Sequence, residues 1–433
     1  MPYLGGNGRR VAVIAGVRTP FAKAGTTLRN MTAIDLGRLC VAELIQRTEL
    51  DGHDIDAIVY GTVVPSVVAP NIAREVSLLP MLPKGVEAYT VGRACASANQ
   101  AITDAADQIV LGHHDMVIAG GAESLSNVPI LHSRSMSDKL VALSRAKSMG
   151  QRVGIVSSIR PKDLVPIAPA IAEPSTGETM GQSAEKMAKI NGIQREEQDQ
   201  FALRSHRLAA VGLEDGRLTA EISPVWVPPK FEQSFDMDNG VRRDTNIEQL
   251  RTLRPVFDKR YGTVTAGNAS PLTDGASAVL LMSDEKARVL GYRPLAYIRS
   301  YAYAALDPGE QLLMGPVLAA PVALERAGLH LKDMDLVEMH EAFAAQVLCN
   351  LKGLESKSWA ERAGYTKPVG EVDRSRLNVM GGSISIGHPF GATGGRILTT
   401  LCNELVRRDG QFGLMTVCAA GGMGHAMVVE RAA

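Results

Sequence analysis

The feature that most constrains the fold is a repeat between the two halves of the chain. The segment ELIQRTELDGHDIDAIVYGTVV (43–64) aligns with VALERAGLHLKDMDLVEMHEAF (322–343) at a constant offset of 279 residues. A second pair, DMVIAGGA (115–122) and LMTVCAAGG (414–422), is also similar. Two related halves built on one topology are the simplest explanation. In the first alignment the identical pairs are Arg47 with Arg326, Leu50 with Leu329, Asp54 with Asp333 and Asp56 with Asp335.

Alternation of short apolar runs with helical patterns predicts an α/β fold. The runs VAVIAGV (11–17), DAIVYGTVV (56–64) and DMVIAGGAES (115–124) have the length of strands, and longer amphipathic segments such as IDLGRLCVAELIQRT (34–48) lie between them. Such alternation is typical of a layered sheet covered by helices. Together with the repeat, it predicts two similar α/β halves.

A region of different composition separates the halves. Residues 125–250 are richer in Ser, Pro, Lys and Arg, and their strand signals are sparse. We interpret this region as a loop domain inserted into the first half, with its clearest helical pattern at 181–210. The expected organisation is an N-terminal half made of 1–124 and 251–292, the loop domain 125–250, and a C-terminal half 293–433.

Composition excludes several classes of protein. The chain has 46 basic and 46 acidic residues, which gives no support for nucleic-acid binding. Its five cysteines form no CxxC pair and no short Cys/His spacing, so neither a metal site nor a disulfide framework is indicated. The sequence has no run of about 18 or more apolar residues, so no membrane span is expected. The N-terminal segment lacks the apolar core of a signal peptide. A cytoplasmic enzyme is expected.

Cys95 is the first candidate for chemistry. In YTVGRACASANQAI (89–102) it lies among small residues, between the end of an expected strand and a helical run. A thiol at a helix N-terminus is expected to have its pKa lowered from about 8.5 toward neutrality, because the helix dipole stabilises an anion. Local sequence alone leaves two interpretations open, a catalytic nucleophile and a small buried cysteine.

His388 is the second candidate. The segment NVMGGSISIGHPFGATGGRIL (378–398) has the pattern of a strand, a Gly-rich turn that contains the histidine, and a helix. The competing interpretation is a nucleotide-phosphate loop, but the segment lacks the GKS or GKT ending and the GxGxxG spacing of such loops. A histidine held before a proline in a tight turn suits a general base.

Two further candidates are expected at strand ends. In LVEMHEAFAAQ (336–346), His340 and Glu341 are not followed by the second histidine of the zinc-protease HExxH pattern. In GLMTVCAAGGMGHAMVVE (413–430), Cys418 ends an apolar run before a Gly-rich turn. Two cysteines at strand ends, one in each half, are consistent with a nucleophile and a proton carrier.

Four ordered motifs, RACAS, HEAFA, GHPFGATG and CAAGGMG, resemble those of the thiolase family, and GTVTAGNASPLTDGA (262–276) and LRPVFDK (253–259) resemble it too. The resemblance covers nearly the whole chain. It implies a fold of two similar α/β halves in a five-layered αβαβα arrangement, with a loop domain on top. HEAFA stands where most thiolases have NEAFA. This feature and the long loop domain resemble the β subunits of bacterial trifunctional fatty-acid oxidation complexes of the anaerobic type.

The resemblance also implies roles for the candidate residues. Cys95 corresponds to the nucleophile that attacks the 3-keto carbon of a 3-oxoacyl-CoA, and His388 to the histidine that activates it. Cys418 corresponds to the general acid and base. The family builds one oxyanion site from the GHP histidine and a water held by the motif residue, here His340. A second uses main-chain N–H groups, here those of Cys95 and Ala420.

Four positions are expected to contact the substrate. Ser270 corresponds to a family serine near the pantetheine of coenzyme A, and Arg242 to a basic residue near the nucleotide, a role that Arg243 could also take. Near Met180, Thr179 replaces a histidine of some short-chain thiolases, which argues against a pure acetoacetyl-CoA specialist. Ala420 stands where many thiolases have glycine. Coenzyme A is expected as co-substrate, with no other cofactor and no metal.

The resemblance implies a 3-ketoacyl-CoA thiolase of fatty-acid β-oxidation, with a biosynthetic acetyl-CoA C-acetyltransferase as the alternative. A ketoacyl-synthase-type condensing enzyme would lack Cys418 and HEAFA, and a non-catalytic subunit would not fill every motif. We also expect a homodimer or homotetramer. The basic, amphipathic insert at 125–175 is expected to bind a hydratase/3-hydroxyacyl-CoA dehydrogenase subunit or an anionic membrane surface. Covering the substrate tunnel is its third interpretation.

Overall fold

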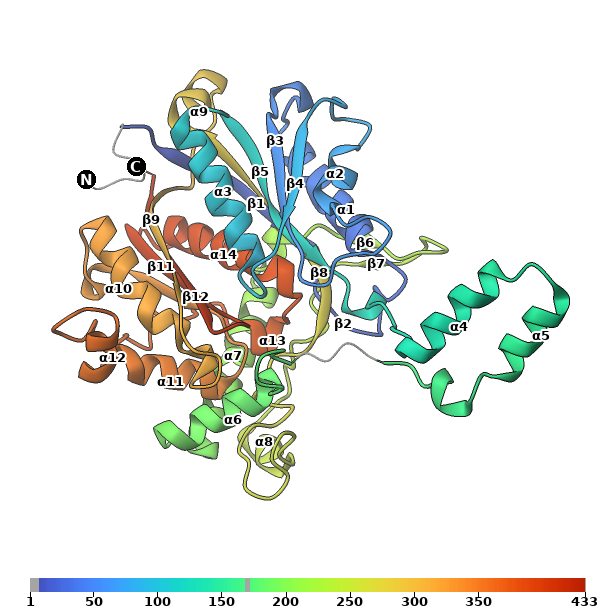
Figure 1. Ribbon diagram of the computed structural model, residues 1–433. Coiled ribbons are helices and arrows are strands. Elements are labelled where there is room, and N and C mark those ends of the chain that lie inside the picture. Colours follow the sequence, from blue (N-terminus) through green and yellow to red (C-terminus); the bar gives the residue numbers. More distant parts are fainter. Residues whose placement is uncertain (1–7, 168–171, 433) are drawn as a thin grey trace.

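The computed structural model describes residues 8–167 and 172–432, and its main strands form one mixed sheet (Figure 1). The strand order is β10-β11-β12-β9-β1-β8-β5-β3-β4, with β2 paired to β8 beside this path. Strand β9 joins the halves by pairing with β1 over three residues. The strands are β1 (Val11–Arg18), β2 (Ala22–Lys23), β3 (Ala57–Gly61), β4 (Glu87–Val91), β5 (Met116–Glu123), β8 (Thr273–Ser283), β9 (Ala296–Ala305), β10 (Leu336–Met339), β11 (Phe412–Ala419) and β12 (Met423–Arg431).

The predicted repeat is confirmed by the pairing of the strands. In the N-terminal half, β3 and β5 are parallel, β5 is antiparallel to β8, and β8 is antiparallel to β1. In the C-terminal half, β10 and β11 are parallel, β11 is antiparallel to β12, and β12 is antiparallel to β9. The two aligned segments each contain the end of a helix, a 3₁₀ turn and a strand, which is β3 in one half and β10 in the other. The halves therefore share one topology.

The helices complete the expected five layers. One outer layer packs on the sheet of the N-terminal half, two helices lie between the halves, and the other outer layer packs on the sheet of the C-terminal half. The first outer layer is α1 (Ala33–Arg47), α2 (Ile72–Ser77) and α9 (Asp284–Leu290); the central layer is α3 (Ser97–Leu111) and α14 (Thr393–Arg407); the second outer layer is α10 (Gly315–Ala327), α11 (Ala344–Leu354) and α12 (Lys357–Arg362).

The central layer is packed closely because its helices carry small residues. A Cβ atom added to Gly394 of α14 would lie 2.2 Å from the side-chain oxygen of Asn99 on α3. One added to Gly395 would lie 2.3 Å from the hydroxyl of Ser277 on β8. Contacts this short are sterically forbidden in a densely packed interior. The two glycines therefore let α14 approach both α3 and the sheet.

The region 125–250 contains helices and only very short strands. The helical pattern predicted over 181–210 is confirmed as two helices, because Gly192 adopts a left-handed conformation (φ 63°) and ends the first of them. Helices α4 and α5 project from the body as an arm (Figure 1). The elements of this region are α4 (Arg134–Arg145), α5 (Met149–Ser157), α6 (Met180–Asn191), α7 (Arg195–Glu214), β6 (Val225–Trp226), β7 (Ser234–Phe235) and α8 (Ile247–Thr252).

A buried ion pair fastens the loop domain to the N-terminal half. The Arg18 guanidinium at the end of β1 donates to both carboxylate oxygens of Asp238, at 2.7 and 2.8 Å. Asp238 also accepts from the backbone N–H of Phe21 at 2.7 Å. A second carboxylate, that of Glu221, lies 3.7 Å from Arg18 Nε. Arg18 and Glu221 are almost completely buried, so each charge depends on its partners.

Replacing Asp238 by Ala should destabilise the protein strongly. The change removes a bidentate partner from a buried guanidinium, and breaking such a pair costs about 3–5 kcal/mol. The free energy of unfolding in urea is the measurement. The exposed neighbour Asp236 is the control, and D236A should change stability by no more than about 0.5 kcal/mol. Equal effects of the two substitutions would contradict the role given to the Arg18–Asp238 pair.

Candidate active site

Cys95 lies between a strand and a helix, as its sequence context predicted. It follows β4 and comes two residues before α3, and Ala94 beside it has a positive φ of 45°. Of the five cysteines, Cys95 alone is partly exposed, and the other four are buried. A reagent that reaches thiols in the folded protein should therefore reach Cys95 first.

His388 is in hydrogen-bonding contact with this thiol. Its Nε2 lies 3.2 Å from Cys95 Sγ, and its Nδ1 lies 2.7 Å from the hydroxyl of Thr393 at the start of α14. Burial, together with the nearby positive charge of Arg396, lowers the pKa of His388 to about 3. The ring is therefore neutral at physiological pH, and Nε2 can accept a proton from the thiol.

The expected lowering of the Cys95 pKa is wrong. Burial raises the pKa of the Cys95 thiol to about 11, and the negative charge of Glu123 adds to this rise. The backbone N–H groups of Ala420 and of Cys95 itself act in the opposite direction, but burial outweighs them. The sequence argument considered only the helix N-terminus, which lowers a thiol pKa. Desolvation, which raises it, depends on the folded structure. The resting site thus holds a thiol beside a neutral imidazole.

His340 completes a cluster with these two residues. It directly follows β10, as predicted, and its ring centroid lies 4.2 Å from that of His388. Ligand atoms of Cys95, His340 and His388 all lie within 4.8 Å of one another. His340 Nδ1 lies 3.0 Å from the hydroxyl of Ser383, whereas its buried Nε2 has no partner among the described residues.

A thiol and two imidazoles are a donor set that could also bind a zinc-like ion. The guanidinium of Arg396 lies close to this cluster, because it donates to the hydroxyl of Ser383, which in turn contacts His340. Its positive charge opposes the binding of a cation. The cluster is therefore better suited to an anionic oxygen than to a metal.

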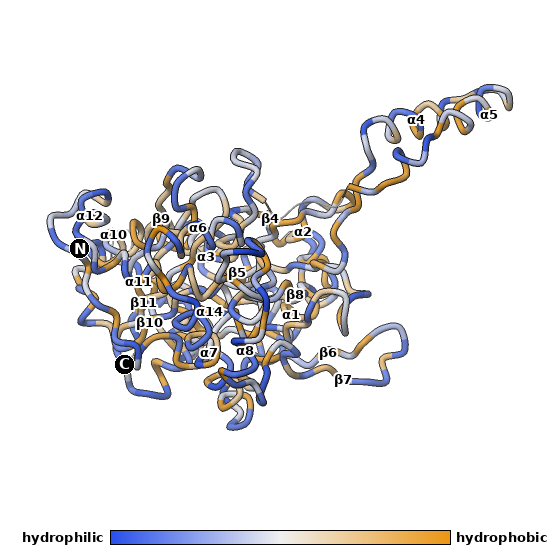
Figure 2. The backbone as a smooth tube through the Cα atoms, turned by 90° about the horizontal axis from the view of Figure 1, so that it is seen from below, coloured by the Kyte–Doolittle hydropathy of each residue, from blue (hydrophilic) through white to orange (hydrophobic). Residues whose placement is uncertain are grey.

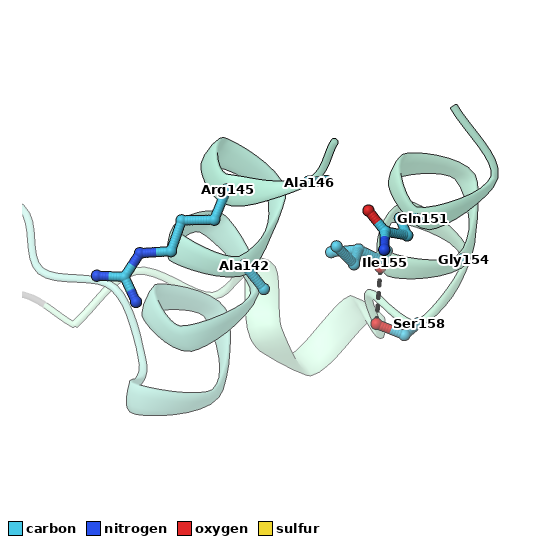
Figure 3. A pocket seen from close by; sticks show the side chains of 7 residues that line it. All are labelled: Ala142, Arg145, Ala146, Gln151, Gly154, Ile155 and Ser158. Carbon is cyan, nitrogen blue, oxygen red and sulfur yellow. Dashed lines mark hydrogen bonds between the residues drawn. The ribbon is translucent and has the colours of Figure 1, made fainter. Parts of the chain in front are cut away.

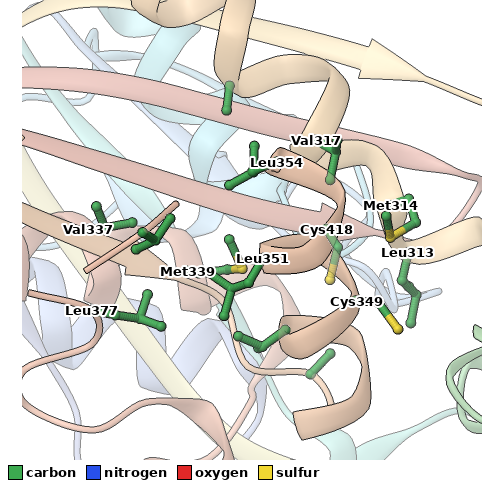
Figure 4. Packing of buried hydrophobic residues seen from close by; sticks show 14 of the residues in the cluster. Leu313, Met314, Val317, Val337, Met339, Cys349, Leu351, Leu354, Leu377 and Cys418 are labelled. Atoms are coloured by element: carbon green, nitrogen blue, oxygen red, sulfur yellow. The ribbon is translucent and has the colours of Figure 1, made fainter. Parts of the chain in front are cut away.

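Cys418 lies near the end of β11, directly before the Gly-rich turn (Figure 4). Burial and the proximity of Cys95 raise its pKa well above the usual value of 9.0. It is therefore a thiol in the resting site and can donate a proton. Ala420 in the same turn directs its N–H at Cys95, and the residues with positive φ are the glycines that follow, at 84° and 68°. An alanine is thus compatible with the backbone at this position.

The Gly-rich turn after His388 is not organised as a phosphate loop. The N–H of Gly391 donates to the carboxylate of Glu123 at 3.1 Å, and that carboxylate also accepts from Val63 and Val64. A buried carboxylate would repel a phosphate there. The predicted strand before this turn is also wrong. Leu377, Val379 and Gly381 form only isolated bridges, and the short helix α13 (Ser383–Ile386) follows them.

The predicted substrate residues lie in different surroundings. Ser270 is close to the cluster, because its N–H donates to the carbonyl of Ala342 in the HEAFA segment, and the carbonyl of Pro271 accepts from the N–H of His388. Met180 begins α6 and packs partly buried against the core of the C-terminal half. No hydrogen bond or ring contact joins Met180 to the described cluster residues.

Arg242 is exposed and lies close to Lys23 and His206, two residues that the sequence argument missed. Burial lowers the pKa of Lys23, and the charge of Arg242 lowers it further. Burial also lowers the pKa of His206 to about 4, with smaller contributions from Arg242 and Lys23, so this ring is neutral. The backbone N–H of Arg242 donates to His206 Nδ1 at 3.2 Å. Arg243 instead lies 3.8 Å from the carboxylate of Glu214. Arg242 is therefore the better placed of the two arginines to meet an anion.

Sequence reasoning also missed Thr393, Ser383 and Arg396, which contact the histidines or their partners. All three lie within the segment 378–398 that contains His388. Only Thr393 had a usable signal, because it stands where a helix that follows a catalytic turn would begin. The contacts of Ser383 and Arg396 depend on tertiary packing.

Comparisons with known proteins agree with this geometry. A family model described as "Thiolase, N-terminal domain" matches residues 11–285, and "Thiolase, C-terminal domain" matches residues 292–431. This chain therefore belongs to the thiolase family.

Individual relatives resemble it over almost their full length. A "3-ketoacyl-CoA thiolase" of Shewanella woodyi is 49% identical over 424 residues, covering 98% of this chain and 97% of the relative. The crystal structure of the Bacillus anthracis acetyl-CoA acetyltransferase matches with a TM-score of 0.84 and 33% identity, covering 100% of both chains. That of human mitochondrial 3-ketoacyl-CoA thiolase in complex with CoA matches with a TM-score of 0.82 and 32% identity, covering 98% of both.

Alkylation of Cys95 by iodoacetamide should depend steeply on pH. Because the thiol pKa is raised to about 11, the thiolate fraction should grow about tenfold for each pH unit between 7 and 9. The rate of loss of activity, with the labelled residue identified by mass spectrometry, is the measurement. The C95S protein should take up no label under the same conditions. A rate that is constant across this range would show that the thiolate is already formed at neutral pH.

Proposed function

We propose that this protein is a 3-ketoacyl-CoA thiolase, an acyltransferase that cleaves 3-oxoacyl-CoA with coenzyme A to acetyl-CoA and a shortened acyl-CoA. The observation that carries the proposal is the 3.2 Å contact between Cys95 Sγ and His388 Nε2, with Cys418 close by. The similarity to bacterial 3-ketoacyl-CoA thiolases supports the same function. It places the protein in fatty-acid β-oxidation.

The first half-reaction uses Cys95 and His388 as a pair. As Cys95 Sγ attacks the 3-keto carbon, its proton passes to Nε2 of the neutral His388 ring. The raised thiol pKa makes this coupled transfer necessary, because little free thiolate is present. The bond between C2 and C3 then breaks, and the enolate of acetyl-CoA takes a proton from the Cys418 thiol.

The second half-reaction reverses the role of Cys418. Coenzyme A enters, its thiol loses a proton to the Cys418 thiolate, and the resulting thiolate attacks the acyl thioester on Cys95. The shortened acyl-CoA leaves, and Cys95 regains its proton from His388. One cysteine can serve both steps, because the first requires an acid and the second requires a base.

Negative charge on oxygen arises at two places in this scheme. The N–H groups of Cys95 and Ala420 both lie at the thiol, where a tetrahedral adduct would form. His340 and His388 lie together on the other side of the cluster and are placed to meet the enolate oxygen. Preformed donors of this kind are usually the largest single contribution to catalysis by acyl-transfer enzymes.

The substrate is expected to enter past the basic group of Lys23 and Arg242, whose charges suit the phosphates of coenzyme A. Ser270 is proposed to lie next to the pantetheine. Met180 would contact the acyl chain from α6. Because Thr179 replaces the histidine of some short-chain thiolases, we propose that chains longer than acetoacetyl-CoA are accepted. The similarity to an acetyl-CoA acetyltransferase keeps the biosynthetic direction as the alternative.

The protein is proposed to act in the cytoplasm as a homodimer or homotetramer. Strand β4 forms one edge of the sheet, and its residues EAYTV carry only one charge. An unprotected edge of this kind favours pairing with another chain. All five cysteines are free thiols, which suits a reducing compartment. The described residues contain no helix with the length and apolar character needed to span a bilayer.

The arm is proposed to bind a hydratase/3-hydroxyacyl-CoA dehydrogenase subunit. Figure 2 shows α4 and α5 far from the body at the end of a stem that is partly hydrophobic. The exposed apolar side chains of α5 include Met149, Val153 and Val156, which are 75%, 62% and 53% exposed. Residues 132–166 contain seven basic and two acidic side chains. Such a surface suits a partner with an acidic, partly apolar face.

The two helices of the arm face each other without filling the space between them. In Figure 3, Ala142 and Ile155 point toward each other, whereas Arg145 points away from α5. Lys139 is not a free charge, because its ammonium donates to Asp163 at 2.6 Å and to the carbonyl of Ser158 at 2.7 Å. It holds the arm together, and substitutions that test docking should spare it.

Substitution of the two active-site cysteines should separate the half-reactions. The C95A protein should have no thiolysis activity with a 3-oxoacyl-CoA of any chain length. The C418S protein should lose about 10²–10⁴-fold in turnover, the usual worth of a general acid or base, while Cys95 is still acylated in a burst by a simple acyl-CoA. Thiolysis in C95A, or a loss below about tenfold in C418S, would refute these roles.

Neutralising the arm should abolish partner binding and leave thiolysis intact. The test variant replaces Arg145, Lys147 and Arg152 by Gln. Its control makes the same change at exposed positions on the body: Lys230, Arg260 and Lys332. Co-purification with a hydratase/dehydrogenase subunit and binding to anionic liposomes are measured separately. Loss of liposome binding alone would transfer the surface to a membrane, and unchanged binding in both assays would refute docking.

A further inference from the structure

His340 carries a polar atom that no described residue satisfies. Its Nε2 is buried without a hydrogen-bond partner, and the ring is completely buried. Leaving a buried polar group unpaired costs about 1–3 kcal/mol. The ring lies beside His388 and within the cluster that contains the Cys95 thiol. An atom kept unpaired at this place is available to a substrate.

The other nitrogen of the ring is held by a serine whose own hydrogen bonding is constrained. Ser383 Oγ lies 3.0 Å from His340 Nδ1 and accepts a hydrogen bond from Arg396 Nη2 at 3.1 Å. A guanidinium can only donate. The hydroxyl oxygen could accept a second hydrogen bond from Nδ1–H, but its own buried proton would then have no acceptor among the described residues. Donation from the Ser383 hydroxyl to Nδ1 of His340 satisfies that proton. Nδ1 then carries no proton.

The charge state of the ring follows from its surroundings. Burial lowers the pKa of His340 well below 6.5, and the neighbouring His388 ring and the positive charge of Arg396 act in the same direction. A neutral imidazole has one proton, and Nδ1 is occupied as an acceptor. The proton is thus on Nε2.

We propose that Ser383 and Arg396 are positioning residues that hold the proton of His340 on Nε2, so that this N–H donates directly to the enolate oxygen of the substrate. Arg396 acts through Ser383 and touches no reacting atom. It is itself buried, with Glu338 at 4.0 Å as its nearest carboxylate. Its charge also favours a negative oxygen near the histidines. The inference deepens the proposed function, on which it rests.

The first test measures the tautomer and needs no activity. The protein is labelled with ¹⁵N-histidine, and the signal of His340 is identified by its loss in H340N. Wild type should show a proton on Nε2 and none on Nδ1. In R396M, Ser383 no longer receives a donor and can accept from Nδ1, so both tautomers should appear. A proton on Nδ1 in the wild-type protein would overturn the proposal.

The second test separates positioning from general stability. S383A should slow carbon–carbon cleavage of a 3-oxoacyl-CoA by about tenfold or more, up to the 10²–10³-fold effect of removing a complete oxyanion donor. It should leave KM and the burst acylation of Cys95 by a simple acyl-CoA nearly unchanged, because that half-reaction forms no enolate. S383T, which keeps the hydroxyl, should restore cleavage.

The matched control is Ser385, on the same short helix α13. It is buried and hydrogen-bonds to the carbonyl of Gly382 and to Ser205, but not to His340. S385A should keep the His340 tautomer and the cleavage rate of wild type. If S383A and S385A slow both half-reactions alike, the proposal fails. If the expected tautomer is observed but no thiolysis occurs in the wild type, the proposed function fails instead.

Discussion

The contact between helices α3 and α14 is the constraint on which the site depends. Each helix starts beside one member of the reactive pair, with Cys95 before α3 and His388 before α14. The helices come from different halves of the chain and meet between the two halves of the sheet. Gly394 lets them approach until Asn99 lies against the backbone of α14. A side chain at that position would push the two helices apart and so move the thiol away from the imidazole.

Burial between the two halves of the sheet also sets the electrostatic state of the site. It raises the pKa values of both cysteines and lowers those of both histidines, so all four groups are neutral at rest. No ion pair has to be broken when a large anionic substrate arrives. Charge appears only as the reaction proceeds, at positions already faced by N–H groups. Exclusion of water from the site therefore has a consequence: Cys95 stays protonated and requires His388 as a base.

The sequence predicted the architecture better than the electrostatics. The repeat specified two equivalent halves, and the motifs specified the cysteines and histidines that the fold brings together. The pKa of Cys95 was predicted in the wrong direction, because the helix N-terminus is a local feature whereas desolvation depends on the whole fold. The break at Gly192 and the helix α13 were missed for a related reason: glycine and serine are compatible with several local structures. Lys23 lies outside every motif, and the contacts that give Ser383 and Arg396 their roles are revealed only by the tertiary structure.

The arm leaves the body and returns to it at one point. The backbone groups of Leu131 and Ile167 bond to each other in both directions, at 3.1 and 2.8 Å. The chain between them is therefore a closed excursion, and the body does not depend on its length. Doubling such a loop costs only about 0.6 kcal/mol in closure entropy. Insertions and deletions in the arm can accumulate at little cost to folding, so this segment is free to diverge at a different pace from the catalytic core that carries it.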